Sequence, residues 1–224
     1  MLQAVTMPRG DPDAQRIVQI QRLIIASLKP AQYLPSDRKL TLILLTIFVM
    51  FSVVGAVPVG YNGFRVLDLQ QRFAYYGLIL LCGTWFSITA VQEIIPGSRH
   101  RTSALATVLG SALSLALLVS LLFQKFDLNQ FVSVGIPCLR LGVVCAALSA
   151  TLFWLLLRKG FFTSPVVAGA TVGSFAGLAG VAVLALHCPI ENSAHTLVWH
   201  LGAMVLAAIA GAVVADVQRL KPVQ

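Results

Sequence analysis

The sequence predicts an all-α membrane protein, a polytopic bundle of six transmembrane helices with a cytoplasmic amphipathic helix at the N-terminus. Of its 224 residues, 58% are hydrophobic and only 11% are charged, whereas soluble proteins have about 25% charged residues. Six apolar stretches each have about the 20 residues that cross a hydrocarbon core about 30 Å thick. Little chain remains for a soluble catalytic domain, so we expect no enzyme.

The segment before the first span, residues 1–39, is expected to be a cytoplasmic domain with one helix. Asp11-Pro12-Asp13 suits a helix start, and Pro30 ends the helix. Between them, apolar residues recur at steps of three and four, which predicts an amphipathic helix too short to span. Its apolar stripe suits the inner leaflet of a membrane or a groove on a protein equally well. The candidate partner-binding residues are Ile17, Ile20, Ile24, Leu28 and Leu34.

Six spans fill the predicted transmembrane domain, residues 40–215, and a short cytoplasmic tail follows at residues 216–224. The spans are predicted at residues 40–59, 73–95, 102–123, 137–157, 164–186 and 195–215. Polar loops are expected at residues 60–72 and 124–135. In the fifth span, Gly169, Gly173 and Gly177 are four residues apart, so they line one face and allow another helix to approach closely.

The basic residues orient the chain. Twelve of the 16 Lys and Arg residues lie in the N-terminal segment, the turns after spans two and four, and the tail. The other four are Arg65, Arg72, Lys125 and Arg140. Because basic residues favour the cytoplasmic side, we expect both termini in the cytoplasm. The net charge of +8 is explained by this bias, and we expect no direct contact with nucleic acid.

Two cysteines stand at polar breaks on the predicted outer side. Cys138 opens span four and Cys188 closes span five, and a short inner turn joins these spans, so both thiols are expected at the same depth. An oxidising compartment would allow a disulfide, which would stabilise by about 4 kcal/mol in the chain-entropy model. The pair could also be reduced or bind a metal, or be two small buried hydrophobic side chains. Cys82 and Cys145 are expected in the core.

Three histidines lie close to the second cysteine in the sequence. Thiolate and imidazole ligands together suit zinc, copper or cadmium. On an α-helix, however, His195 and His200 would point about 140° apart, so they would not easily bind one ion. The alternative is an interfacial belt of histidines with Trp199. The candidate metal ligands are Cys138, Cys188, His187, His195 and His200.

Several short motifs together resemble a known family. They are Leu28-Lys29-Pro30, Leu34-Pro35 and Arg38 before span one, Pro137-Cys138, and Cys188-Pro189 leading to Val198-Trp199. With six spans and similar loop lengths, the chain resembles the bacterial NrsF family, the negative regulators of sigma F, which are six-span membrane anti-sigma factors. The histidines around Cys188 depart from the family pattern and leave the signal open.

The resemblance implies a location, a partner and a sensor. It implies an extracytoplasmic-function sigma factor held inactive at the bacterial inner membrane by the N-terminal segment. It also implies that Cys138 and Cys188 are the outer pair that the family needs to respond to heavy-metal or redox stress. No cofactor beyond a candidate transition-metal ion is expected.

Two other functions remain open from the sequence. A small transporter or metal-handling protein would use the His and Cys residues at its outer mouth, and would show ion flux in vesicles without a cytoplasmic partner. A membrane electron-transfer subunit would show haem absorbance, but the outer histidines lack partners at matched depth on a second helix.

Overall fold

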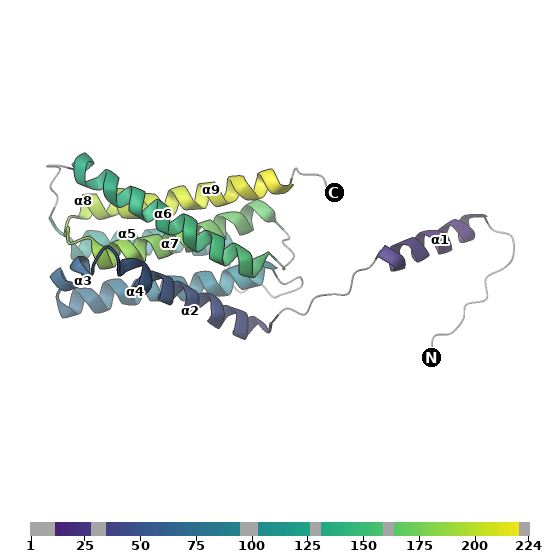
Figure 1. Ribbon diagram of the computed structural model, residues 1–224, viewed down its shortest axis with the longest axis horizontal. Coiled ribbons are helices and arrows are strands. Elements are labelled where there is room, and N and C mark those ends of the chain that lie inside the picture. Colours follow the sequence, from purple (N-terminus) through teal and green to yellow (C-terminus); the bar gives the residue numbers. More distant parts are fainter. Residues whose placement is uncertain (1–11, 28–34, 95–102, 126–130, 159–163, 220–224) are drawn as a thin grey trace. The chain divides into compact units, whose positions relative to one another are not determined.

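The computed structural model describes residues 12–27, 35–94, 103–125, 131–158 and 164–219. The chain divides into two units, Met1–Tyr33 and Leu34–Gln224. All regular secondary structure in the described ranges is helical, as the sequence predicts (Figure 1).

The first unit contains helix α1, Pro12–Ser27, close to the predicted position. Two of the candidate partner-binding residues, Ile17 and Ile20, are 53% and 55% exposed. The side chain of Ile24, and the whole of Leu28 and Leu34, lie outside the described residues. The helix is therefore present, while its role as an amphipathic binding surface stays a prediction.

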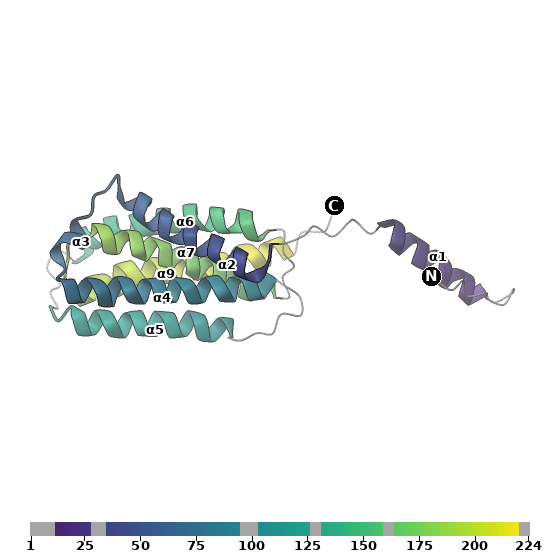
Figure 2. The ribbon, with the colours of Figure 1, turned by 90° about the horizontal axis from the view of Figure 1, so that it is seen from below.

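The second unit contains six helical segments long and apolar enough to cross a membrane, which confirms the predicted fold class. Five are single helices: α2 (Asp37–Ala56), α4 (Leu69–Ile94), α5 (Ala104–Leu122), α6 (Phe131–Leu157) and α7 (Pro165–His187). The last is continuous from α8 (Ser193–His195) through a π-helical turn, η1 (Thr196–His200), into α9 (Leu201–Arg219). In the two views of Figures 1 and 2, α7 runs through the middle of this bundle.

Two predicted loops are shorter than expected. The fourth span does not begin near Pro137 but at Phe131, and Pro137 lies inside α6. Residues 60–72 hold the short helix α3 (Asn62–Val66) and the start of α4 at Leu69. The start of α6 was wrong because Gly135 and Pro137 were taken as the end of a loop, whereas helices of membrane proteins tolerate such residues when neighbouring helices help to satisfy the freed backbone groups. The start of α4 was wrong because its polar first turn was taken as part of the loop.

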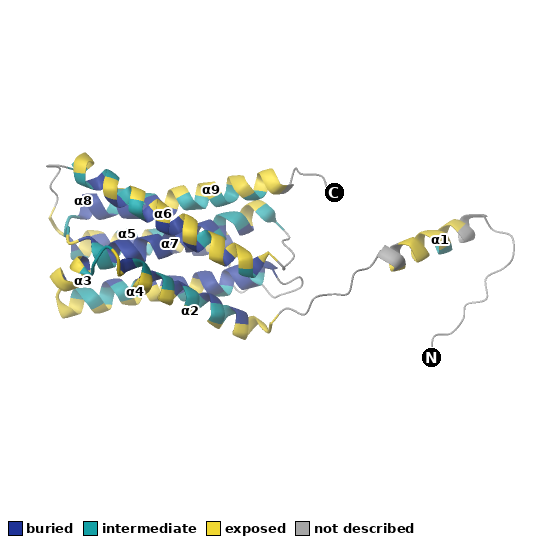
Figure 3. Ribbon diagram, in the orientation of Figure 1, coloured by how far each residue is buried: buried dark blue, intermediate teal, exposed yellow. Residues whose placement is uncertain are grey.

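Helix α7 is the centre of the bundle. In the most apolar stretch of α7, 72% of the residues are buried, whereas in the corresponding stretch of α5 only 22% are buried (Figure 3). Phe175 of α7 stacks on an aromatic ring from each of three other helices, with ring centroids 5.3 Å from Phe48 of α2, 6.1 Å from Phe86 of α4 and 4.2 Å from Phe153 of α6. A displacement of α7 would therefore directly change its packing against α2, α4 and α6.

Helices α7 and α9 pack closely against each other. At Gly169, Gly173 and Gly177, the space that a Cβ atom would need is taken by atoms of α9, backbone atoms at each position. The predicted glycine face therefore allows another helix to approach closely, as the spacing of the glycines indicates. It brings the last span against α7 and so aligns the π-helical turn with the end of α7.

The two ends of the bundle differ in what they hold. The start of α2 and the end of α9 lie at one end (Figure 1). The start of α6, the end of α7 and the turn η1 lie at the other end. Cys138 and Cys188 therefore lie at the end of the bundle opposite to the start of α2 and the end of α9.

Candidate thiol and imidazole site

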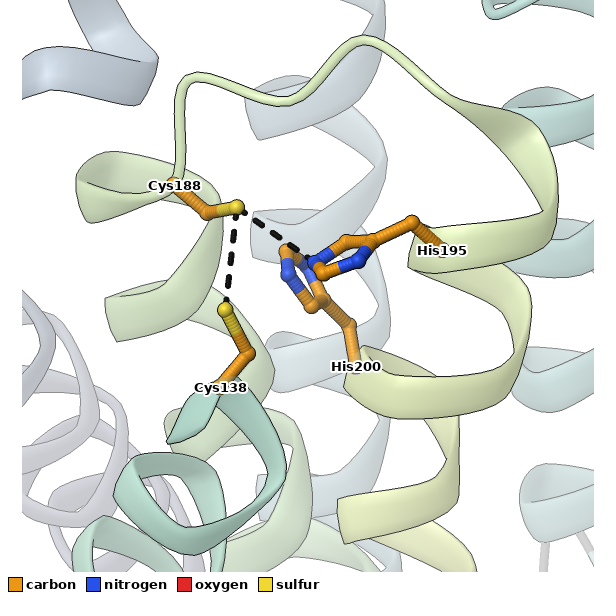
Figure 4. Close-up of side chains that lie close together, drawn as sticks. All are labelled: Cys138, Cys188, His195 and His200. Atoms are coloured by element: carbon orange, nitrogen blue, oxygen red, sulfur yellow. Dashed lines mark hydrogen bonds between the residues drawn. The ribbon is translucent and has the colours of Figure 1, made fainter. Parts of the chain in front are cut away.

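Two cysteines 50 residues apart in the chain lie side by side. Cys138 is in the second turn of α6, and Cys188 directly follows α7, where its backbone N–H donates to the Leu184 carbonyl at 2.8 Å. Their Sγ atoms are 3.8 Å apart (Figure 4). Both side chains are buried, and both residues are free cysteines. The sequence-predicted pair is thus brought together without a covalent bond.

The loop after Cys188 is held by three hydrogen bonds and one ion pair. Asn192 caps the next helix, because its side-chain oxygen accepts from the His195 N–H at 3.3 Å. The Ser193 N–H and Oγ both donate to the carbonyl of Lys125, at 3.1 and 3.3 Å. The Lys125 ammonium also lies 3.6 Å from the Glu191 carboxylate. These contacts hold the start of the last span against the segment that follows α5.

The turn η1 aligns two histidines. The Leu201 N–H donates to the Thr196 carbonyl five residues back, which is the π-helical pattern. The extra residue in such a turn brings positions five apart onto nearly the same face. The rings of His195 and His200 accordingly meet edge to face, with centroids 5.3 Å apart and an angle of 79° between their planes. The expectation that they point about 140° apart was wrong, because it assumed an α-helix.

Four of the five candidate ligands form one group, called here the four-residue cluster. It consists of Cys138, Cys188, His195 and His200, and one ligand atom from each lies within 4.8 Å of the others. The Sγ of Cys188 is 3.5 Å from Nε2 of His195 (Figure 4). His187, the last residue of α7, is not among the four.

His200 is a buried member of the cluster. It is only 2% exposed, and among the described residues neither of its ring nitrogens has a hydrogen-bond partner. Figure 4 shows its ring turned toward His195 and the two thiols. A buried polar group without a partner costs free energy, so this position calls for a ligand or another role.

Trp199 packs the turn η1 against the start of α6. The indole of Trp199 occupies the space that a side chain at position 135 would need, and Gly135 leaves that space open. Trp199 also packs against Phe131, with ring centroids 5.2 Å apart. The role of Gly135 was not predicted, because a glycine two residues before a proline reads as a loop residue until its neighbour in the fold is known.

A small cavity reaches the cluster. Cys188 and His200 line it together with Thr196, Glu191 and Tyr75. The neighbouring Cys138 thiol and burial raise the pKa of the Cys188 thiol above its usual range. Cys188 therefore carries its proton at neutral pH, and a metal ion bound there must displace that proton.

The other two cysteines lie elsewhere in the bundle. Cys145 is buried with Ala56 and Val183, and the Sγ of Cys82 is 3.9 Å from the Ser114 hydroxyl. Neither belongs to the four-residue cluster. They provide matched controls for experiments on Cys138 and Cys188.

The fold and the cluster define the class of protein: a six-span helical membrane protein with thiols and imidazoles buried near one end of its bundle. The NrsF family, described as negative regulator of sigma F, matches residues 26–218. The chain belongs to this family of anti-sigma factors, and the family implies a sigma factor as its partner. No curated protein and no solved structure matches the chain.

The matched region begins near the end of α1. Helix α1 spans Pro12–Ser27, so most of it precedes the first matched residue, 26. The family match covers the segment leading into α2, all six candidate spans and the four-residue cluster. The binding role predicted for Ile17 and Ile20 therefore depends on the sequence pattern of α1.

Proposed function

We propose that this protein holds an extracytoplasmic-function sigma factor inactive at the bacterial inner membrane and releases it under metal or redox stress, when the Cys138–Cys188 pair changes state. The observation that carries the proposal is the 3.8 Å separation of the two sulfurs. The consecutive helices α6 and α7 bring them together, at the end of the bundle away from the start of α2. The family supplies the sigma factor as partner.

The distribution of charge supports the orientation. Twelve of the 16 basic residues lie in the sequence ranges 1–39, 96–101, 158–160 and 216–224. These are the chain up to the first turn of α2, the stretches between α4 and α5 and between α6 and α7, and the end of α9 with the tail. Since basic residues favour the cytoplasmic side, the end of the bundle with the start of α2 faces the cytoplasm and the cysteine pair faces outward. The N-terminal segment is then on the side where a sigma factor is found.

The pair can change state in two ways. An oxidant such as peroxide takes two electrons and two protons from the thiols and leaves a disulfide, which shortens the sulfur separation to about 2.0 Å. A thiophilic metal ion instead displaces the thiol protons and binds both sulfurs. Either event links the start of α6 to the end of α7.

Helix packing provides a route from the pair to the N-terminal segment. Phe175 of α7 stacks on Phe48 of α2, and α2 directly follows the segment that precedes the bundle. Two arrangements of α7 that differ by a few kcal/mol are sufficient for a switch. The apolar residues predicted to contact the sigma factor are Ile17, Ile20, Ile24, Leu28 and Leu34. Regulation by binding and release requires no catalysis.

Replacement of both outer cysteines tests the proposal. In cells, the double variant Cys138→Ser and Cys188→Ser should still repress sigma-dependent transcription but lose induction by cadmium, copper and peroxide. The matched control is Cys82→Ser with Cys145→Ser, which should keep induction. Normal induction in the Cys138 and Cys188 double variant would contradict the proposal.

A further inference from the structure

We propose that Cys138, Cys188, His195 and His200 form a tetrahedral binding site for one zinc or cadmium ion. The ion would bind through two thiolates and two imidazoles. This inference names the ligand of the proposed sensor, and it rests on the proposed function only for the consequence that binding releases a sigma factor. The binding itself is argued from the geometry, burial and charge of these four side chains.

The distances match a tetrahedral ion. Zinc binds sulfur at about 2.3 Å and imidazole nitrogen at about 2.0–2.1 Å, which places two sulfurs about 3.8 Å apart and a sulfur and a nitrogen about 3.5 Å apart. The two sulfurs of the cluster are 3.8 Å apart, and the Cys188 sulfur is 3.5 Å from the His195 nitrogen. All four ligand atoms lie within 4.8 Å of one another. An ion would therefore need only small adjustments of the side chains.

Hydrogen bonding alone leaves one member of the cluster unexplained. Contacts between the two thiols, and between Cys188 and His195, account for three side chains. His200 is 2% exposed, and both its ring nitrogens lack a hydrogen-bond partner within the described part of the chain. Coordination of an ion by one of these nitrogens gives His200 a partner.

Charge also favours a divalent ion. Cys138 and Cys188 are 9% and 8% exposed, so two free thiolates there would be costly. When a divalent ion binds, each thiol loses one proton, and the two thiolates neutralise the two positive charges of the ion. The complex with two neutral imidazoles is therefore uncharged, and two protons are released. Sulfur and nitrogen ligands without a carboxylate suit zinc or cadmium and not magnesium or calcium.

A cavity and a π-helical turn adjoin the cluster. The small cavity is lined by Cys188 and His200 of the cluster and by Glu191. The turn η1 brings His200 beside His195. π-Helical turns are rare and frequently lie at functional sites, which fits a role in ligand placement.

Cobalt binding to the reduced full-length protein in detergent tests the site. Co²⁺ should bind with one ion per chain and produce the thiolate charge-transfer band and the intense visible bands of tetrahedral cobalt. Zn²⁺ and Cd²⁺ should displace it. His200→Ala should weaken binding by more than the roughly 10–100-fold that loss of an outer-shell partner costs. His187→Ala and Cys145→Ala, which remove a histidine and a cysteine outside the cluster, should leave binding unchanged.

Other results would overturn the inference. These are the absence of stoichiometric binding by the reduced parent protein, a weak octahedral cobalt spectrum, or equal affinities for His200→Ala and His187→Ala. If His200→Ala fails to fold, His200→Cys retains a ligand and should bind cobalt with stronger charge-transfer absorption. An unaltered spectrum in that variant would also contradict coordination by residue 200.

A second measurement separates this inference from the proposed function. The same protein preparations are tested for capture of the sigma factor. Cobalt binding without sigma capture would support the metal site and contradict the proposed function. Sigma capture without cobalt binding would support the proposed function and contradict the metal site.

Discussion

Helix α1 and the four-residue cluster depart from ordinary burial in opposite directions. In α1, apolar side chains are exposed, with Ile20 at 55% and Leu23 at 65%. In the cluster, polar side chains are buried, with His195 at 3% and His200 at 2%. Exposed apolar groups and buried polar groups are the informative exceptions to the usual distribution. The two proposals assign a different kind of partner to each region, a sigma factor to α1 and an ion to the cluster.

The largest expected effect concerns α1. The double variant Ile17→Asp and Ile20→Asp places two charges where apolar anchors are predicted to contact the sigma factor. Loss of an interface anchor costs about 2 kcal/mol or more, so the two changes together should weaken sigma binding by roughly a thousandfold. Affinity for purified sigma factor, measured with full-length protein in detergent, checks this.

The matched control adds the same charges to polar positions of the same helix. Gln19→Asp with Gln21→Asp should leave sigma binding nearly unchanged, and neither double variant should alter cobalt binding. Equal affinities of the two double variants for the sigma factor would remove α1 from the interface. The segment between α1 and α2 would then be the remaining candidate.

The next effect concerns the support of the cluster. Gly135→Leu should push the Trp199 indole aside, because this indole fills the space of the new side chain, and so displace the turn that carries His200. Metal affinity should fall by about 10–100-fold, as for other supporting residues of metal sites. Gly110→Leu is the control, since nothing lies within 4 Å of a Cβ atom at Gly110. Equal cobalt affinities of the two variants would show that Trp199 does not position the turn.

A smaller effect is expected on the connection between the two regions. Phe175→Leu removes the ring that stacks on Phe48, Phe86 and Phe153. Metal and sigma affinities measured separately should be kept, while the effect of the metal on sigma binding should weaken by about 0.5–2 kcal/mol. Titration of sigma factor with and without Cd²⁺ measures this. If the metal affects sigma binding equally in the variant and the parent protein, the coupling between the cluster and α1 does not depend on Phe175.

The smallest effect distinguishes two ways of holding the loop after Cys188. Asn192→Ala removes the cap on His195 and should destabilise by about 1 kcal/mol. Lys125→Ala removes only the ion pair with Glu191, in which the Lys125 side chain is 79% exposed, and should cost less, about 0.5 kcal/mol. Thermal unfolding in detergent compares the two variants. A larger loss for Lys125→Ala would mean that the ion pair holds the loop more strongly than the Asn192 cap does.

The fold was predictable because a membrane imposes a simple rule. Spans such as α5 and α9 are long apolar stretches, and their backbones satisfy their own hydrogen bonds. The spacing of Gly169, Gly173 and Gly177 also identified the face on which α9 packs. The starts of α4 and α6 were not predictable in this way, because glycine, proline and polar residues occur both in loops and in the outer turns of spans.

The cluster was predictable in its members but not in its geometry. Cys138 and Cys188 could be paired from the antiparallel order of their spans. The alignment of His195 with His200 depends on the π-helical turn Thr196–His200, and the spacing of apolar residues does not reveal a single turn of this kind. Gly135 gains its meaning only from Trp199, which is 64 residues further along the chain.

Release of the sigma factor across a membrane tests the central claim most directly. The full-length protein is placed in vesicles with the sigma factor bound on the enclosed, N-terminal side, and Cd²⁺ is added outside. The account predicts that the sigma factor dissociates from the parent protein and from His187→Ala, but stays bound to His200→Ala. Retention of the sigma factor by the parent protein with Cd²⁺ bound, or equal release from His200→Ala, would contradict it.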